Sequence, residues 1–421
     1  MQTVISIILV IGVIIFVHEL GHLIVAKRAG ILCREFAIGF GPKLFSFRKG
    51  ETLYTIRLLP LGGYVRMAGE DPEMVQIKTG HDVGLQFNAE GKVTKIILNR
   101  KKKLSHTETL NVQRIDLEHD LFIEGYNAEE ELVRYEVDRE AVLVYDNQEM
   151  LIAPYDRQFG SKTLGQRAAT IFASPLANFI LAFVLFTGLA LSFGVPSEEP
   201  IIGDVLPGSV AEEAGLEQGD RILAINQKAM DSWDELVRTI MHNPGRELVF
   251  VVERNNEEFE LTITPAVREH ELESGEQIGF IGVHQHVEHS VLGAFVYGFN
   301  YMVELSTLIF KVIGMLFTGA VGLDALAGPV GIFDFTGQAA QAGLPILLRW
   351  TAALSVNLAI LNLLPIPALD GGRLLFLALE AVRGRPIDPQ KEGLAHFIGF
   401  ALLMLLILVV TWNDIQRVFF N

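Results

Sequence analysis

The stretch His18-Glu19-Leu20-Gly21-His22 combines residue types and spacing that could do metal chemistry. Residues four apart share one face of a helix, so both imidazoles can bind one ion while Glu19 lies beside them. Cys33 is the single cysteine, so a further ligand must be His, Asp or Glu. Two imidazoles and a carboxylate suit zinc, with a fourth position open to water. The sequence therefore predicts one Zn²⁺ per chain.

The alternative interpretation is a structural polar cluster. It would place three ionisable side chains inside an apolar run, at a cost of about 2 to 3 kcal/mol each if unpaired. A bound metal offsets that cost, and it also supplies chemistry. It would activate a water for hydrolysis, and Glu19 would accept the proton and later donate it to a leaving amine.

Asp370 is the candidate third ligand, because it lies at a similar depth in the membrane. His18 and His22 precede Lys27 by nine and five residues, about 8 to 14 Å along a helix. The apolar run that ends at Leu364 stops about 8 Å short of the same surface. The segment Pro365-Ile-Pro-Ala-Leu-Asp-Gly-Gly372 disfavours regular helix, and irregular backbone at this depth needs a surrounding cavity. The alternative role for Asp370 is a helix cap at a surface turn.

Composition indicates that part of the chain lies in lipid. Of 421 residues, 50% are hydrophobic and 20% are charged, which is too apolar for one water-soluble domain. The 34 basic residues against 50 acidic ones give a net charge of -16, which argues against a nucleic-acid partner. The absence of a Walker A pattern argues against ATP.

The predicted fold class is an α-helical polytopic membrane protein with four transmembrane helices. The spans are expected at residues 1–27 with the HExxH motif, 168–195, 345–372 and 393–413. Basic residues follow the first span and lie between the last two, which places both termini outside the cell and the active site near the cytosolic face. Residues 290–344 are left as an outer-surface amphipathic helix and loop, since a crossing by Val291–Thr318 would reverse this charge bias.

Three pieces between the spans are expected to be β-rich. Residues 28–74 form a membrane-associated β-hairpin region, with its turn at Pro60, Gly62 and Gly63. Residues 75–165 form a small cytosolic β-rich insertion without an assignable motif.

The third piece, residues 199–285, has the element order of a PDZ domain. A short helix ended by Gly215 precedes a turn at Gly219-Asp220, a strand and a helix over Trp233–Met241. A plain β-sandwich is the alternative. PDZ domains bind an extended chain by strand addition, and we expect Pro200–Val205, with Gly203, to hold a ligand carboxylate. The nearby His284, His286 and His289 are more typical of a solvated linker than of a metal site.

The sequence resembles the site-2 protease family of intramembrane zinc metalloproteases, in its bacterial branch, which implies a bacterial cell membrane. The resemblance rests on HELGH, FAIGFGP, PLGGYVRMAGEDPEM, SPLANFILAF, GPVGI and NLLPIPALDGG, and it extends along the whole chain. It implies His18, His22 and Asp370 as ligands and Glu19 as base, with Asn362 and Pro365 handling the substrate. Some members carry two PDZ domains, whereas this chain has one.

The resemblance also implies the substrates. They are single-pass membrane proteins already trimmed outside by a site-1 type protease, such as anti-sigma factors, or remnant signal peptides. A substrate helix must be unwound before cleavage, and the amide of Asn362 and an edge strand near Gly62 and Gly63 could replace its hydrogen bonds. Asn178 and Asn357 could help, or could simply join helices. The rival function is a non-catalytic membrane PDZ receptor for trimmed tails, which would not need Glu19.

Overall fold

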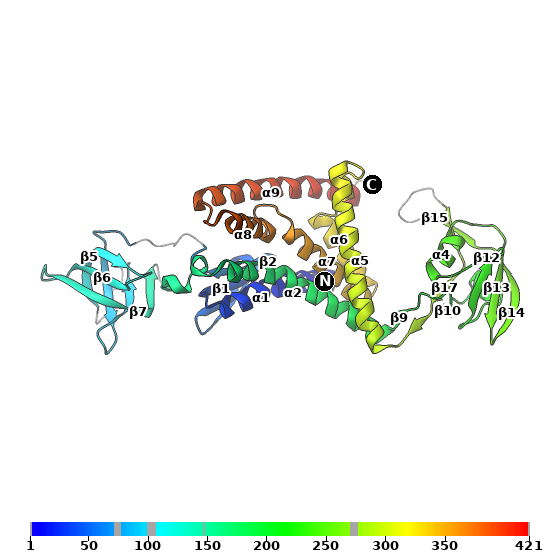
Figure 1. Cartoon of the computed structure of the whole chain (residues 1–421), viewed down its shortest axis with the longest axis horizontal. Helices are drawn as coiled ribbons and strands as arrows, with labels where there is room; N and C mark the ends of the chain where they lie inside the picture. The colour runs from blue at the N-terminus through cyan, green and yellow to red at the C-terminus, as the bar shows by residue number, and fades with distance from the viewer. Residues whose placement is uncertain (1, 71–76, 99–106, 146–147, 270–276, 420–421) are drawn as a thin grey trace. The chain divides into compact units, whose positions relative to one another are not determined.

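The computed structural model describes residues 2–70, 77–98, 107–145, 148–269 and 277–419. The chain forms two compact units, Met1–Phe183 with Met302–Asn421, and Val184–Tyr301. The first unit contains most of the helices and a β-rich insertion, and the second is mostly β-structure (Figure 1). The helices α2 (Leu164–Phe193) and α5 (Val291–Thr318) each have one end in each unit.

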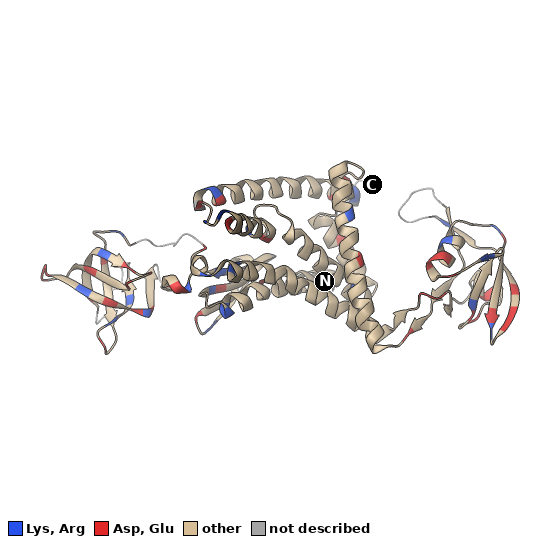
Figure 2. Ribbon diagram, in the orientation of Figure 1, with Lys and Arg blue, Asp and Glu red and all other residues tan. Residues whose placement is uncertain are grey.

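Five helices in the described residues are long and apolar enough to cross a membrane. Figure 2 shows few charged residues along most of their length. These helices are α1 (Gln2–Arg28), α2 (Leu164–Phe193), α5 (Val291–Thr318), α7 (Leu344–Leu363) and α9 (Pro389–Phe419). Four match the expected spans, and α5 meets the same criterion of length and composition.

Two shorter helices occupy segments for which the sequence analysis expected no helix. The first, α6 (Pro329–Gln341), lies in the predicted surface loop and packs against α1, α7 and α9. Its first turn is held by the buried Asp414 carboxylate of α9, which accepts a hydrogen bond from the Gly331 N–H at 2.8 Å. The loop prediction was therefore wrong for this stretch, since a helix with few strong helix formers is stabilised here by tertiary packing.

The second short helix, α8 (Asp370–Arg383), begins at Asp370 and ends at Gly384 in the left-handed conformation. The expected interruption is present between Leu364 and Leu369, but Gly371 and Gly372 belong to the first turn of α8. A Cβ on Gly371 would lie 2.2 Å from the Leu364 carbonyl oxygen. These glycines therefore permit close contact with the end of α7 and do not break the helix.

The hairpin after α1 is formed by β1 (Cys33–Lys49) and β2 (Thr52–Met67), with its turn at Gly50. Residues 54–56 run parallel to residues 36–38, whereas residues 63–65 run antiparallel to them, so the chain reverses direction within β2. The predicted turn at Pro60, Gly62 and Gly63 is therefore present between these two arms of β2. Phe36 pairs with Val65 and also with Tyr54, so two parts of β2 flank β1. The two arms of β2 therefore do not pair with each other, as the arms of a simple hairpin would.

Residues 77–151 form the β-rich insertion, as expected, although its predicted start at 75 lies outside the described residues. Its sheet has the order β4-β3-β5-β6-β7-β8 and closes where β4 also pairs with β7. Alternate residues fill an apolar core that includes Leu85, Leu110 and Ile123. Its strands are β3 (Asp82–Phe87), β4 (Val93–Ile97), β5 (Glu108–Asp116), β6 (Phe122–Tyr126), β7 (Leu132–Tyr145) and β8 (Gln148–Leu151).

The second unit contains the elements expected for residues 199–285. The helix α4 (Trp233–Met241) has the predicted bounds, and Ser232 caps it by accepting a hydrogen bond from the Glu235 N–H. The other elements are β9 (Val195–Pro196), β10 (Ile202–Val205), α3 (Val210–Glu213), β11 (Arg221–Ile225), β12 (Lys228–Ala229), β13 (Leu248–Arg254), β14 (Glu257–Ile263), β15 (Ala266–Glu269), β16 (Gln277–Phe280), β17 (Val283–Gln285) and β18 (Val287–Glu288). A four-stranded sheet, β12-β11-β13-β14, carries the core together with α4.

Candidate metal centre

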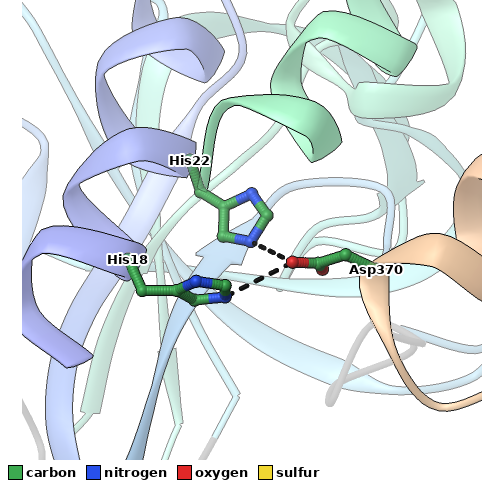
Figure 3. Close-up of side chains that lie close together, drawn as sticks. All are labelled: His18, His22 and Asp370. Atoms are coloured by element: carbon green, nitrogen blue, oxygen red, sulfur yellow. Dashed lines mark ion pairs between the residues drawn. The ribbon is translucent and has the colours of Figure 1, made fainter. Parts of the chain in front are cut away.

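Two histidines of α1 and one aspartate of α8 meet at a single point. The Nε2 atoms of His18 and His22 lie 3.3 and 3.5 Å from the same carboxylate oxygen, Oδ2 of Asp370. Figure 3 shows the three side chains directed toward one another. Their potential ligand atoms all lie within 4.8 Å of each other, and no other group of this kind occurs in the described residues. The structure thus brings together the three residues predicted as ligands.

The hydrogen bonds around these residues are those expected around a bound cation. The Nδ1 atom of His22 lies 2.9 Å from the Thr170 carbonyl oxygen, which can only accept a hydrogen bond. Nδ1 of a neutral His22 therefore carries the hydrogen, and the Nε2 lone pair faces the Asp370 carboxylate. Ser174 donates to Asp370 Oδ2 at 2.9 Å. Lone pairs that converge in this way repel one another unless a cation lies between them, as zinc would.

The sequence analysis missed Thr170 and Ser174. Together with Asn178 they lie four residues apart in α2, so they form one polar face in the apolar stretch of this helix. The three residues are completely buried. Polar side chains repeated at this spacing inside an apolar helix are the signal that could have identified them.

Glu19 lies at the junction of α1 and the hairpin. Its side chain is buried, and the site of a Cβ on Gly63 is 2.8 Å from Glu19 Cγ. Gly63 also lies against the Ala37 carbonyl oxygen, so a larger residue would separate β2 from both neighbours. Gly62 has a positive φ of 145° and contacts the ring of Phe40. Gly63 therefore contacts the candidate base. Gly62 has a backbone conformation that residues with a side chain rarely adopt.

Asn362 and Pro365 precede Asp370 along the chain. Asn362 is half-buried in the last turn of α7, and Pro365 is exposed in the connection that follows. Ala368, also in this connection, has a positive φ of 84°, which is rare for a residue with a side chain. Its N–H donates to His396 Nδ1 of α9 at 2.9 Å. The connection that delivers Asp370 is therefore held by the last helix of the chain.

Two ion pairs fix α8, the helix that carries Asp370. Glu380 accepts two hydrogen bonds from Arg167 of α2, at 3.0 and 2.5 Å. Arg373 pairs with Glu70, which follows β2. These pairs are largely buried, so removing one partner would leave an uncompensated charge.

Comparison with known proteins agrees with this geometry. A profile described as Peptidase family M50 matches residues 6–406. The chain belongs to this family. It is 54% identical over 419 residues to the zinc metalloprotease RasP of Geobacillus kaustophilus, with 100% of this chain and 99% of the relative covered. The regulator of sigma-W protease RasP of Bacillus subtilis is 51% identical, with 99% of each chain covered. The probable protease eep of Enterococcus faecalis is 46% identical, with 100% of each covered.

Family membership identifies the class of enzyme to which this chain belongs. This M50 peptidase is a membrane-embedded zinc metalloprotease of the site-2 type, which acts in regulated intramembrane proteolysis. The HExxH motif on an apolar helix is the part of the sequence that predicted this activity.

Gly203, the residue expected to help bind a carboxylate, lies in the second unit of this peptidase. It belongs to β10, which pairs with β17. A Cβ on Gly203 would lie 2.5 Å from the Gln285 carbonyl oxygen. A larger residue at this position would therefore separate the two strands, so this glycine is required first for strand packing.

We expect Glu19→Gln to lower cleavage of a model transmembrane substrate at least about 100-fold, because the amide cannot accept a proton. The variant should still contain close to one zinc per chain, since the base is not a ligand. Metal analysis beside a cleavage assay checks both parts. Residual hydrolysis within a few-fold of the unmodified enzyme would rule out this role.

We expect Asp370→Asn and His22→Ala to lower zinc occupancy together with activity, because each change removes one of three protein ligands. Glu19→Gln is the matched control, since it changes a buried polar residue of the same site without removing a ligand. Full zinc retention in Asp370→Asn would mean that the third ligand lies elsewhere.

Proposed function

We propose that His18, His22 and Asp370 hold one zinc ion and that Glu19 is the general base for hydrolysis of a peptide bond within the membrane. The convergence of two imidazole nitrogens and one carboxylate oxygen carries this proposal. Bound zinc supplies Lewis-acid activation of a water and stabilises an oxyanion. Glu19 would accept the proton of that water and return it to the leaving amine. A non-catalytic receptor for trimmed tails would not need two imidazoles and a carboxylate at one point beside Glu19.

We infer that the reaction occurs near the cytosolic face, with both termini and the PDZ-type unit outside. Basic residues follow the end of α1, which is therefore its cytosolic end. Asp370 follows the end of α7 and contacts His18 and His22, in the second half of α1. The ends of α1 and α7 therefore lie on the same side. Because α2 returns to the outside, the segment from 194 to 343 must begin and end there, which favours a surface position for α5.

The hairpin provides a place for an unwound substrate. In the described part of the chain, residues Gly63–Met67 pair with β1 on one side and with no strand on the other. An extended substrate could add to this free edge, and Gly63 lies directly against Glu19. We propose that this edge, with Asn362 and Pro365 at the end of α7, replaces the hydrogen bonds that a substrate helix loses.

We propose that the substrates are single-pass membrane proteins whose outer domain another protease has already removed. The name of the Bacillus subtilis relative, a regulator of sigma-W, supports anti-sigma factors as one class, and remnant signal peptides are a second. The PDZ-type unit would admit trimmed tails, either by binding a new C-terminus or by excluding large domains.

We expect an outside location for Glu257 and Gln338 and a cytosolic location for Lys391. After Cys33→Ser removes the single cysteine, residues changed to cysteine at the first two positions should react with an impermeant reagent in intact cells. A cysteine at position 391 should react only after lysis. Labelling at 391 with protection at 338 would mean that α5 crosses the membrane, and the four-span topology would be wrong.

We expect a substrate with a bulky folded outer domain to resist cleavage and the same substrate, shortened outside, to be cut. Two shortened versions of equal length, ending in an apolar residue or in Asp, separate the two kinds of selection. Recognition of a C-terminus predicts slower cleavage of the Asp version, whereas size exclusion predicts equal rates. Comparable cleavage of the untrimmed substrate would argue against both.

A further inference from the structure

Each imidazole of the metal centre has a second ring nitrogen that must be satisfied. For His22 the partner is the Thr170 carbonyl oxygen. For His18 the partner is the side chain of Asn178, whose nitrogen lies 3.4 Å from His18 Nδ1. Both partners come from α2, two turns apart on the same face. Asn178 is completely buried, so its amide has few possible partners.

The orientation of the Asn178 amide decides whether His18 can bind a metal. With the amide nitrogen toward His18, it donates to Nδ1, and a neutral ring then carries its hydrogen on Nε2. A protonated Nε2 has no lone pair for a metal. In this orientation Asn178 Oδ1 is also buried without a hydrogen-bond partner. The oxygen and nitrogen of an amide have nearly the same shape, so the hydrogen-bond network assigns their positions.

A half-turn of the amide resolves the first point. The oxygen then accepts the hydrogen of His18 Nδ1, and the Nε2 lone pair faces Asp370 as it does in His22. We propose that Asn178 is a positioning residue that fixes His18 in the tautomer able to bind zinc. This inference rests on the proposed ligand set. It extends that set to a side chain that contacts neither zinc nor substrate.

A role in joining helices explains the contacts of Asn178 less well. The hydrogen bond from α2 to α7 at this position is made by the Asn178 backbone, whose carbonyl oxygen accepts from Ser355 Oγ at 2.9 Å. The side chain is not needed for that bond. Its hydrogen-bonding contact is with His18 of α1. Replacing the side chain should therefore change the ring of His18 more than the packing of α7.

The test compares Asn178→Leu, Asn178→Asp and Ser355→Ala in the full-length protein. Zinc affinity is measured by competition with a chelator, and unfolding of the metal-free protein by its midpoint temperature. Asn178→Leu has a similar volume and no acceptor, so zinc affinity should fall about 10- to 100-fold. Asn178→Asp keeps the acceptor, so its affinity should equal or exceed that of the unmodified protein. Ser355→Ala should lower the midpoint while affinity stays within about two-fold.

Whether Asn178→Asp binds zinc more tightly or more weakly than Asn178→Leu separates a positioning role from a purely structural one. A structural role predicts that a buried charge is worse than leucine, so Asn178→Asp would bind zinc more weakly than Asn178→Leu. That result, or affinity within two-fold of the unmodified protein for Asn178→Leu, would overturn the proposal. If the leucine variant does not accumulate, Asn178→Asp decides alone, because loss of zinc affinity in it contradicts positioning.

Zinc titration of Asp370→Asn and His22→Ala in the same series separates this inference from the proposed ligand set. Normal affinity in both of those variants would mean that the ligand set is wrong, and the inference would fail with it. Weak binding in both, combined with normal binding in Asn178→Leu, would remove only the positioning role.

Discussion

The convergence of His18, His22 and Asp370 is the constraint on which the rest of this structure depends. Polar and ionisable groups inside a membrane protein are costly unless they are paired, and this chain places three of them at one point between apolar helices. Their partners come from a third helix, α2, through Thr170 and Ser174. The site is therefore built by three helices at once, and none of them could hold it alone.

Close approach of the backbones makes this convergence possible. A Cβ on Gly21, inside the HExxH motif, would lie 2.4 Å from the Ala173 carbonyl oxygen of α2. Gly63 and Gly371 perform the same function where the hairpin meets α1 and where α8 meets α7. Small residues at helix contacts are typical of membrane proteins, because packing replaces the hydrophobic effect as the source of association. Here the same contacts also bring α2 and the hairpin close to the proposed metal ligands and the proposed base.

The hairpin and the helix α8 connect the metal centre to its surroundings. The edge of β2 ends beside Glu19, and Glu70, which follows β2, pairs with Arg373 of α8. Arg167 of α2 holds the same helix through Glu380. The helix that carries one ligand is thus fixed by the helix that supports the other two and by the strand proposed to bind substrate.

The sequence by itself determined the chemistry of the site and most of its elements. The spacing of His18 and His22 follows from the helical repeat, and the depth of Asp370 follows from the length of an apolar run, so both could be predicted. The bounds of α4 were likewise set by local capping and hydrophobic pattern. The turn predicted at Pro60, Gly62 and Gly63 is present, but local turn signals do not reveal that residues 36–38 lie between its two arms.

Only the tertiary structure decided the contacts between segments distant in the chain. It supplied Thr170 and Ser174 as partners of the proposed ligands, the position of β2 beside Glu19, and the helices α6 and α8. The glycines at 371 and 372 appeared as helix breakers in the sequence, yet they lie in the first turn of a helix. Glycine is required at both positions, because the carbonyl oxygens of Leu364 and Ile366 leave no room for a side chain. Such requirements arise from the space that a neighbouring backbone segment occupies, and a local sequence pattern does not show which segment that will be.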